Sequence, residues 1–232
     1  MTGEFACAAI VSVGNELLFG ETVNTNAAWL GRALAEKGIV VSHGYTVGDN
    51  RTNIQEVVRT ATRSTDVVLI SGGLGPTEDD ITRNAVADLF ERPLRSNERL
   101  LADLKARFRA HGYREFPETN LSQVEVPEGA IVLNNPNGTA PSFIVEDLRG
   151  SIFALPGVPF ELKWLFNNEV APYLTKKFDL NKIITYSILK VADLGESAVD
   201  DLIGHLIANS SNPTVGVLAH PGQVDIRIAA KA

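Results

Sequence analysis

In the larger, N-terminal part of the chain, short continuous apolar runs alternate with longer segments whose apolar residues recur at helical spacing. Three short apolar runs, "AIVSV", "IVVSHGYTV" and "DVVLIS", have the composition of β-strands. Each is followed by a longer segment whose apolar residues recur every three or four positions, as on one face of a helix: "NTNAAWLGRALAEKG", "RTNIQEVVRTATRS" and "DDITRNAVADLF". Strands that alternate with helices favour βαβ units. The pattern therefore predicts an α/β fold, a three-layer αβα domain with a mainly parallel sheet.

Local signals mark the ends of some of these helices. Gly38 stands where the first helix would end, and Thr52 and Gln55 have the spacing of a capping box at the start of the second. Further along, "SNERLLADLKARFRAHG" carries an apolar stripe opposite its charges, which predicts a surface helix.

The pattern changes after the turn-rich "NNPNGTAPS". Two short apolar runs, "FIVED" and "SIFAL", are split by a polar connection, which predicts an antiparallel pair at the edge of the sheet. The segment "LPGVPFELKWLFNNEVAPYL" then predicts a turn and a helix that packs Trp164, Leu165 and Val170 inward.

The apolar rhythm is lost near "LTKKFDLNK", and we expect a domain boundary there because polar linkers commonly separate domains. The prediction is a larger domain over residues 1–177 and a small α+β domain over residues 178–232. The small domain is expected to contain a strand "ITYSILKV", a helix "GESAVDDLIGHLIAN" and two further strands, "TVGVLA" and "QVDIRIAA".

The last two strands of the small domain have the pattern of a hairpin. Pro221 and Gly222 fit the two central positions of a type II turn, since Pro fixes φ and Gly tolerates φ above zero. In the final strand polar residues alternate with apolar ones, and we expect it to bury one face only, formed by Val224, Ile226 and Ile228.

Composition narrows the function classes. Hydrophobic residues make up 44% and charged residues 21%, as in ordinary globular proteins, and the formal charge of −7 argues against a large nucleic-acid footprint. The single cysteine, Cys7, excludes a disulfide within the chain and is expected in the core. The first apolar run stops at Gly14 to Glu16, too soon for a membrane span. We therefore expect a cytoplasmic protein with no membrane partner.

The stretch "SGGLGPTEDDIT" carries the candidate chemistry, because it lies where a buried strand passes into a helix. Backbone N–H groups at such a junction lack partners and favour anions, phosphate above all. Gly72, Gly73 and Gly75 would allow close approach, and Pro76 would stiffen the loop. The Lys and Ser or Thr of a P-loop are missing, as is the third glycine of a dinucleotide fingerprint. A purely structural turn is the alternative.

Asp79 and Asp80 extend the hypothesis to a metal. Two carboxylates beside a phosphate would repel it unless a divalent cation lies between them, and Mg²⁺ is commonly held by one or two carboxylates plus substrate phosphates. The structural alternative is that Asp80 is only the N-cap of a helix that begins at Ile81.

Other strand-to-helix connections carry similar polar residues. In open α/β sheets, ligands bind beyond the carboxyl ends of the strands, so residues from several connections can meet there. The candidates for this convergence are Glu16, Asn24, Asn26, Asp49, Asp80 and Thr139.

Taken together, these stretches resemble the competence/damage-inducible CinA proteins, within the wider molybdopterin-binding group that includes the MoaB and MogA proteins. The resemblance lies in "VSVGNELLFGETVNTN", "VGDN", "SGGLGPTEDDIT", "NNPNGTAPSF" and "LPGVPFELK", in the family's order. In addition, "GESAVDDLIG" and "NPTVGVLAHPGQVDIRIAAKA" resemble the family's small KH-like domain. The family's further C-terminal deamidase domain, which acts on nicotinamide mononucleotide, has no counterpart in this sequence, so that activity is not expected here.

The resemblance implies a nucleotide-binding larger domain that acts as a metal-dependent ADP-ribose pyrophosphatase, with AMP and ribose 5-phosphate as products. It implies Asp49 and Asp80 as catalytic residues, and Asp79 and Asp80 as ligands of Mg²⁺, Mn²⁺ or Co²⁺. The substrate-binding residues it implies are Gly14, Glu16, Asn24, Asn26, Gly72, Gly73, Gly75, Pro76, Thr77, Gly138, Thr139, Pro156 and Gly157.

The same resemblance leaves two alternatives open: a molybdopterin-binding or adenylyl-transfer protein of molybdenum cofactor synthesis, and a non-catalytic nucleotide-binding module. Leu74 replaces the Thr of "GGTG" in the cofactor-synthesis relatives, which favours the CinA branch. The expected partners are a small-molecule nucleotide and further copies of the chain. RNA is not expected, because the KH-like segment lacks a GXXG clamp.

Overall fold

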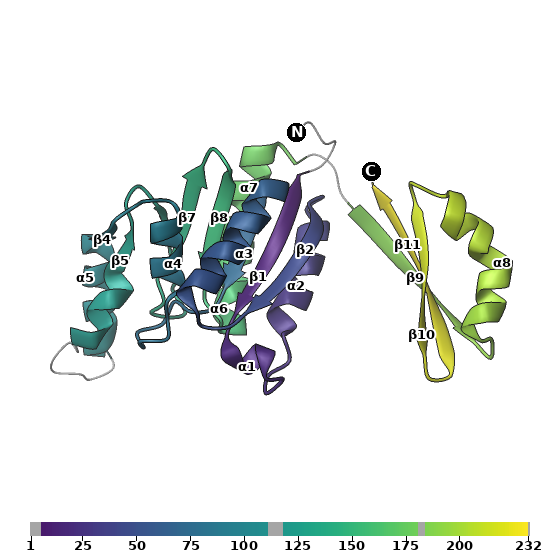
Figure 1. The fold of residues 1–232 in the computed structure, drawn as a ribbon, viewed down its shortest axis with the longest axis horizontal. Helices are drawn as coiled ribbons and strands as arrows, with labels where there is room; N and C mark the ends of the chain where they lie inside the picture. Colours follow the sequence, from purple (N-terminus) through teal and green to yellow (C-terminus); the bar gives the residue numbers. More distant parts are fainter. Residues whose placement is uncertain (1–5, 111–117, 181–183, 232) are drawn as a thin grey trace.

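The structure of the chain is a computed structural model, and it describes residues 6–110, 118–180 and 184–231. Figure 1 shows a larger unit, up to α7, and a smaller unit, from β9 onward. The helical segments of the larger unit are α1 (Asn15–Leu18), α2 (Thr25–Ala35), α3 (Arg51–Ser64), α4 (Thr82–Leu89), α5 (Glu98–Ala110), η1 (Glu118–Val124), α6 (Pro159–Leu165), η2 (Phe166–Val170) and α7 (Ala171–Phe178). Its strands are β1 (Cys7–Val13), β2 (Val40–Val47), β3 (Val67–Ser71), β4 (Leu94–Ser96), β5 (Glu125–Pro127), β6 (Ile131–Leu133), β7 (Ser142–Asp147) and β8 (Gly150–Leu155).

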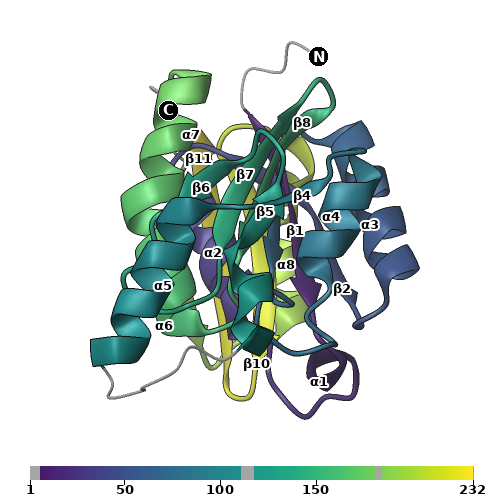
Figure 2. The ribbon, with the colours of Figure 1, turned by 90° about the vertical axis from the view of Figure 1, so that its left-hand side faces the viewer.

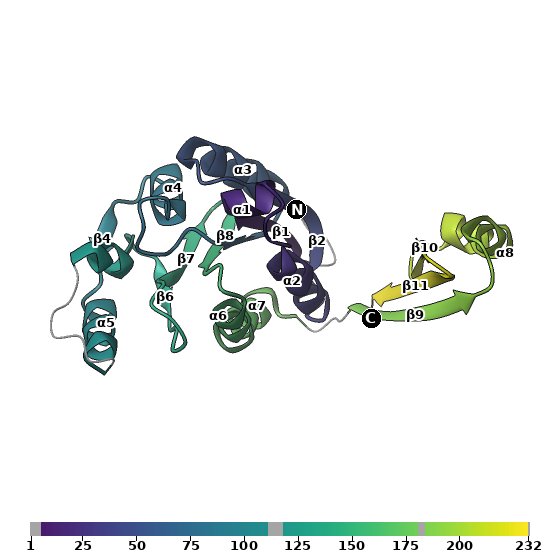
Figure 3. The same ribbon diagram turned by 90° about the horizontal axis from the view of Figure 1, so that it is seen from below.

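The central sheet has the strand order β2-β1-β3-β8-β7-β6. The first four strands run parallel, whereas β7 pairs antiparallel with β8 and β6 pairs antiparallel with β7. The predicted parallel sheet with an antiparallel edge is confirmed. Since the parallel strands share one direction, their carboxyl ends meet at one edge of the sheet, the edge that Figure 3 views from below.

The core follows the period-two alternation of strand side chains. Along β1, Ala8 and Ile10 pack with α2, α6 and α7 on one face, whereas Ala9 and Val11 pack with α3 and α4 on the other. Figure 2 shows these two groups of helices on either side of the sheet. The predicted three-layer αβα arrangement is confirmed, and both faces of the inner strands are closed to water.

The helix predicted after "LPGVP" contains a short π-helical segment, because α6 passes through η2 into α7. Leu165 and Val170 are fully buried, as predicted, and Trp164 packs partly buried against the same core.

Two local predictions are wrong. Asn50, rather than the Thr52–Gln55 pair, caps α3, because its side chain accepts a hydrogen bond from the N–H of Asn53 over 3.1 Å. Cys7 is half-buried instead of lying in the core. It is the first residue of β1, and its thiol lies 3.1 Å from the Ser42 hydroxyl.

The smaller unit is an antiparallel sheet in the order β10-β11-β9, formed by β9 (Ile184–Ala192), β10 (Thr214–His220) and β11 (Gln223–Lys231), with α8 (Glu196–Asn209). Gly222 has a φ of 79°, as the predicted type II turn requires. The expectation of one buried face on β11 is wrong at Asp225, which is only 7% exposed. Its carboxylate accepts a hydrogen bond from Gln223 over 3.0 Å and lies 3.3 Å from His220 Nε2, which compensates its burial.

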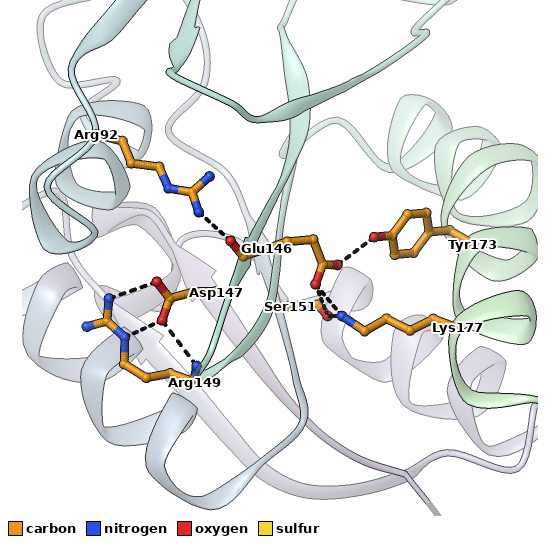
Figure 4. A network of polar contacts seen from close by, with 7 residues as sticks. All are labelled: Arg92, Glu146, Asp147, Arg149, Ser151, Tyr173 and Lys177. Atoms are coloured by element: carbon orange, nitrogen blue, oxygen red, sulfur yellow. Dashed lines mark hydrogen bonds and ion pairs between the residues drawn. The ribbon is translucent and has the colours of Figure 1, made fainter.

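A polar network lies at the β7–β8 turn, at the end of these strands opposite to the carboxyl end of β8 (Figure 4). The Glu146 carboxylate accepts hydrogen bonds from the Tyr173 hydroxyl over 2.6 Å and from the Lys177 ammonium group, and the Ser151 hydroxyl donates to it over 3.3 Å. Arg92 donates to the backbone carbonyl of Glu146. We call these residues, together with the neighbouring pair Asp147 and Arg149, the β7–β8 network.

Charges in this network are tuned by their partners. Burial opposes ionisation of Glu146, but the hydrogen bonds from Lys177 and Tyr173 outweigh it, so the pKa of Glu146 lies below its ordinary value. Burial and the hydrogen bond to Glu146 raise the pKa of Tyr173 to about 12. The hydrogen bond from Arg149 lowers the pKa of Asp147 beside it.

Two further expectations concern membrane-spanning helices and the domain boundary. None of the helices in the described part of the chain has the length and apolar character that crossing a bilayer demands. The last helix of the larger unit ends at Phe178, and the boundary between residues 177 and 178 stays a prediction.

Candidate functional site

A pocket of about 420 Å³ opens at the carboxyl edge of the parallel strands. Five strand ends contribute to it: the ends of β1 and β2, the loop after β3, the turn after β8 and the connection before β7. Its lining residues are Val13, Gly14, Glu16, Asp49, Gly72, Gly73, Leu74, Gly75, Pro76, Asp79, Asp80, Gln123, Thr139, Ala140, Pro156, Gly157, Val158 and Glu161.

The loop after β3 crosses the middle of this pocket and requires glycine at two positions. Gly72 and Gly73 have φ values of 103° and 67°, in the region that disfavours other residues. A Cβ atom on Gly72 would lie 2.3 Å from the backbone oxygen of Val13, and one on Gly73 would lie 2.3 Å from Thr82 Oγ1. The glycines therefore let the loop pack against the end of β1 and the start of α4.

Backbone donors of the loop stay available. Gly72 N–H donates to Leu155 O over 3.0 Å, but the N–H groups of Gly73, Leu74 and Gly75 have no hydrogen-bond partner among the residues that the structure describes. Unpartnered amides that follow one another in a turn attract anions. Such amides are able to bind an anion, and phosphate binding by this loop stays a prediction.

Asp80 closes the loop on itself instead of capping the helix. Its Oδ2 accepts hydrogen bonds from the Thr77 N–H over 3.0 Å and from the Thr77 hydroxyl over 2.6 Å. The helix begins one residue later than expected, at Thr82, and Ile81 supplies no side-chain cap. The alternative in which Asp80 is only an N-cap is therefore wrong. The Thr77 hydroxyl and the backbone N–H of Asp79 also lower the pKa of the fully exposed Asp79.

Asp49 is fixed at the β2 end of the pocket. Its Oδ2 accepts a hydrogen bond from the Asn15 N–H over 3.0 Å, while the Asn15 side chain accepts one from the Asp49 N–H over 3.3 Å. This reciprocal pair ties α1 to the end of β2. It leaves Asp49 Oδ1 without a partner among the described residues, and Asp49 lines the same pocket as Glu16.

The other end of the pocket carries a second pair of polar groups. Gln123 Nε2 donates to Thr139 Oγ1 over 3.0 Å, and Asn135 Nδ2 donates to Glu161 Oε2 over 2.7 Å. Both amide side chains are buried, with 2% of Gln123 and 8% of Asn135 exposed. Buried groups on η1 and on the β6–β7 connection thus orient two pocket residues.

The sequence-predicted site residues fall into two groups. Twelve line the pocket: Gly14, Glu16, Asp49, Gly72, Gly73, Gly75, Pro76, Asp79, Asp80, Thr139, Pro156 and Gly157. The other four do not line it. Asn24 caps α2 by accepting from Ala27 N–H, Asn26 donates to Gly157 O over 2.7 Å, and Thr77 binds Asp80. Gly138 presents its carbonyl to Arg107 over 2.8 Å.

The side chains that line the pocket carry an excess of negative charge. Five carboxylates line it and no Lys or Arg does, counting the described residues only. Burial lowers the pKa of Arg83, in the first turn of α4, although the charges of Glu125 and Asp80 oppose this. An anionic ligand would therefore meet net negative side-chain charge, relieved by the loop amides.

The carboxylates suit a hard divalent cation only in part. Oxygen donors are the ligands that Mg²⁺ and Mn²⁺ prefer, and Asp79 and Asp80 are adjacent. Within residues 6–110, 118–180 and 184–231, however, no group of three or more acidic, His or Cys side chains is arranged to hold a metal. The residues fit a cation that shares its coordination sphere with ligand phosphates, as Mg²⁺ commonly does.

Sequence reasoning missed several residues of the pocket end. Glu161 lies inside the quoted "LPGVPFELK" motif, so its carboxylate in the first turn of α6 was a signal that could have been used. Gln123 and Asn135 lie in segments without apolar periodicity, and nothing local in the sequence indicates their positions.

Comparisons with known proteins agree with this fold. The family described as "probable molybdopterin binding domain" matches residues 9–176, and the "Damage-inducible protein CinA KH domain" matches residues 187–232. A crystal structure of the protein CinA, of unknown function, from Thermoplasma acidophilum is 35% identical, with a TM-score of 0.67 over 76% of this chain and 99% of that chain. A molybdenum cofactor biosynthesis protein from Corynebacterium diphtheriae, 15% identical over 76% of this chain and 97% of its own, shares the fold at a TM-score of 0.51.

Two relatives named competence-damage inducible proteins match almost the whole chain. That of Alkaliphilus oremlandii is 43% identical over 96% of this chain and 53% of its own length, and that of Caldicellulosiruptor saccharolyticus is 41% identical over 97% and 54%. The chain thus spans about half the length of these relatives. The larger unit has the fold of the molybdopterin-binding α/β domains. The chain belongs to the CinA family and joins that domain to the family's KH domain.

Proposed function

We propose that this chain hydrolyses a nucleotide diphosphate in the pocket, with ADP-ribose as substrate and AMP and ribose 5-phosphate as products. The observation that carries the proposal concerns the amides of Gly73, Leu74 and Gly75. They have no hydrogen-bond partner in the described structure, and they belong to a pocket whose described lining holds carboxylates but no Lys or Arg. Amides bind phosphate oxygens directly, whereas the carboxylates tolerate a diphosphate only with a shared cation.

In this proposal the chain's residues position the linked phosphates. The loop amides bind nonbridging oxygens, and the hydrogen bonds from Thr77 fix the Asp80 carboxylate beside them. Asp79 and Asp80 would hold a divalent cation, which would neutralise phosphate charge and lower the pKa of a bound water.

Asp49 orients the attacking water. Asn15 holds its Oδ2, so its Oδ1 is the oxygen that accepts a hydrogen bond from that water. The water oxygen forms a bond to one phosphorus, and the bridging P–O bond breaks. One water proton leaves through Asp49 to solvent. Ribose 5-phosphate departs with the bridging oxygen, and the phosphate that was attacked stays on AMP.

Product analysis tests this function. The chain is incubated with ADP-ribose, FAD or ATP and with Mg²⁺, Mn²⁺ or Co²⁺, and AMP is separated by chromatography. We expect AMP and ribose 5-phosphate in equal amounts from ADP-ribose. If no diphosphate yields AMP with any of the three ions while nucleotide still binds, the hydrolase proposal fails and a binding module remains.

Asp80→Asn tests the assignment of the carboxylate. We expect kcat to fall by about a hundred-fold, in line with the loss of one fixed charge at a transition state. Asp88→Asn is the matched control, since Asp88 lies on the following helix, pairs with Arg51 and does not line the pocket. Equal activity of the two variants and the parent, with unchanged circular dichroism, would remove Asp80 from the mechanism.

A second candidate is molybdopterin binding or adenylyl transfer. The match of residues 9–176 to a probable molybdopterin binding domain favours it. Incubation with ATP and a pterin phosphate distinguishes it, because adenylyl transfer releases pyrophosphate and forms an adenylylated pterin, whereas hydrolysis of ADP-ribose forms neither.

A further inference from the structure

The pocket end formed by Thr139 and Glu161 carries a donor and an acceptor that none of the described residues uses. Thr139 Oγ1 accepts from Gln123, so the hydroxyl proton stays free to be donated. Glu161 Oε2 accepts from Asn135, while Glu161 Oε1 has no partner among the described residues. Both side chains line the pocket.

These two groups are held from behind by more than one contact. The Asn135 side-chain oxygen accepts from the Asn137 N–H over 3.1 Å, so both ends of this amide are engaged. Arg107 of α5 donates to the carbonyl of Asn135 over 2.6 Å and to that of Gly138 over 2.8 Å. A Cβ atom on Gly138 would lie 1.9 Å from Glu161, so the loop packs closely on that carboxylate.

Burial of the Gln123 side chain costs stability in a way that packing does not explain. Its Oε1 is buried and has no hydrogen-bond partner in the described part of the chain, although the residue is only 2% exposed. An unpartnered buried acceptor destabilises a protein, so an apolar residue of similar size would serve packing better. Gln123 is therefore best explained by its bond to Thr139, which sets the direction of that hydroxyl.

We propose that the Thr139–Glu161 end of the pocket binds sugar hydroxyl groups, with Gln123 and Asn135 as positioning residues. A hydroxyl both donates and accepts, so it matches a donor and an acceptor that line the same pocket and have no other described partner. The inference rests on the diphosphate lying over the glycine loop as proposed above, and it assigns the terminal ribose to this end.

Binding of two uncleavable ligands tests the inference without relying on turnover. The ligands are the α,β-methylene analogue of ADP-ribose and the α,β-methylene analogue of ADP carried as the methyl ester of its terminal phosphate, so that both have the same charge and differ in the terminal ribose. Titration calorimetry with Mg²⁺ gives both dissociation constants. We expect the parent chain to bind the ADP-ribose analogue about ten-fold more tightly, the gain of one or two hydrogen bonds.

Variants of the positioning pair make the test specific. Thr139→Val keeps the shape but removes the hydroxyl, and we expect it to abolish the ten-fold preference, whereas Thr139→Ser retains it. Gln123→Leu should reduce the preference while leaving affinity for the ADP analogue unchanged. Thermal unfolding checks that each variant is folded, and the Thr139 pair carries the test alone if Gln123→Leu is not.

Equal losses for both ligands in Thr139→Val would overturn the inference, because the adenosine or the phosphates would then occupy this end. No preference in the parent chain would overturn it as well. Failure of the proposed hydrolysis is distinguishable, since a chain that binds the analogues with the expected preference but yields no AMP keeps the sugar site and loses only the reaction.

Discussion

Two polar clusters lie at opposite ends of β8, and they differ in how completely their groups are paired. In the β7–β8 network both carboxylate oxygens of Glu146 have donors, and Figure 4 shows the side chains directed toward one another. In the pocket, three loop amides, Glu161 Oε1 and buried Gln123 Oε1 lack partners in the described structure.

The difference separates polar groups that stabilise the fold from those that await a ligand. A satisfied cluster repays its desolvation within the chain, whereas unpaired donors and acceptors cost stability unless something else binds them. Mutations in the β7–β8 network should therefore change stability and spare binding, and mutations in the pocket should change binding first. The predictions below test this division, beginning with the largest expected effect.

Gly72→Ala should affect both properties, because the loop backbone is itself part of the packing. The new Cβ would lie 2.3 Å from Val13 O at a φ of 103°, and we expect the free energy of unfolding to fall by about 3 kcal/mol. Nucleotide binding should become undetectable. Urea denaturation and calorimetry measure the two effects. Gly44→Ala, with no atom within 4 Å of its Cβ and an ordinary φ, is the control and should be near neutral; parity between the two variants would refute the packing argument.

Glu146→Gln should lower stability and leave the pocket unaffected. The ion pair with Lys177 is about one-third exposed on each side, at 34% and 32%, so we expect a loss of about 1 kcal/mol. Glu128→Gln removes a partner of Arg95 from a pair that is 57% and 65% exposed, and it should cost only about a few tenths of a kcal/mol. A change in nucleotide affinity in Glu146→Gln would break the division between the clusters.

Acid should weaken the β7–β8 network in a defined range. The folded-state pKa values of Glu146 and Asp147 lie below their ordinary values of 4.5 and 3.8, so their contribution to stability is complete above those values. It is lost as the pH falls through the lower, folded-state pKa values. Denaturation at a series of pH values should show a steeper loss in the parent than in Glu146→Gln, and parallel curves would contradict the cause.

Alkali should also weaken the same network, as the pH rises instead of falls, and by a smaller amount. Because the pKa of Tyr173 is raised from 10.0 to about 12, its contribution is present below pH 10.0 and is lost as the pH rises toward 12. The tyrosinate absorbance of the parent minus that of Tyr173→Phe should titrate within this range. A difference titration at the ordinary pKa of tyrosine would show that the hydrogen bond to Glu146 has no effect.

Much of the fold follows from local pattern. The short, continuous apolar runs of β1 and β3 and the helical spacing that follows each of them indicate the parallel, three-layer sheet. Twelve predicted site residues line one pocket because the carboxyl ends of parallel strands meet at one edge. Predictions failed where a choice between neighbouring side chains was needed, as when Asn50 capped α3 in place of Thr52.

The sequence by itself determined the order and type of the elements, the glycine loop after β3 and the family, because periodicity, turn chemistry and motifs are local properties. Only the tertiary structure decided which distant polar residues meet: Gln123 with Thr139, and Asn135 with Glu161. It also decided that Asp225 is buried and that Asp80 binds Thr77. Such pairings depend on how whole elements pack, and no pattern within a short stretch of chain contains that geometry.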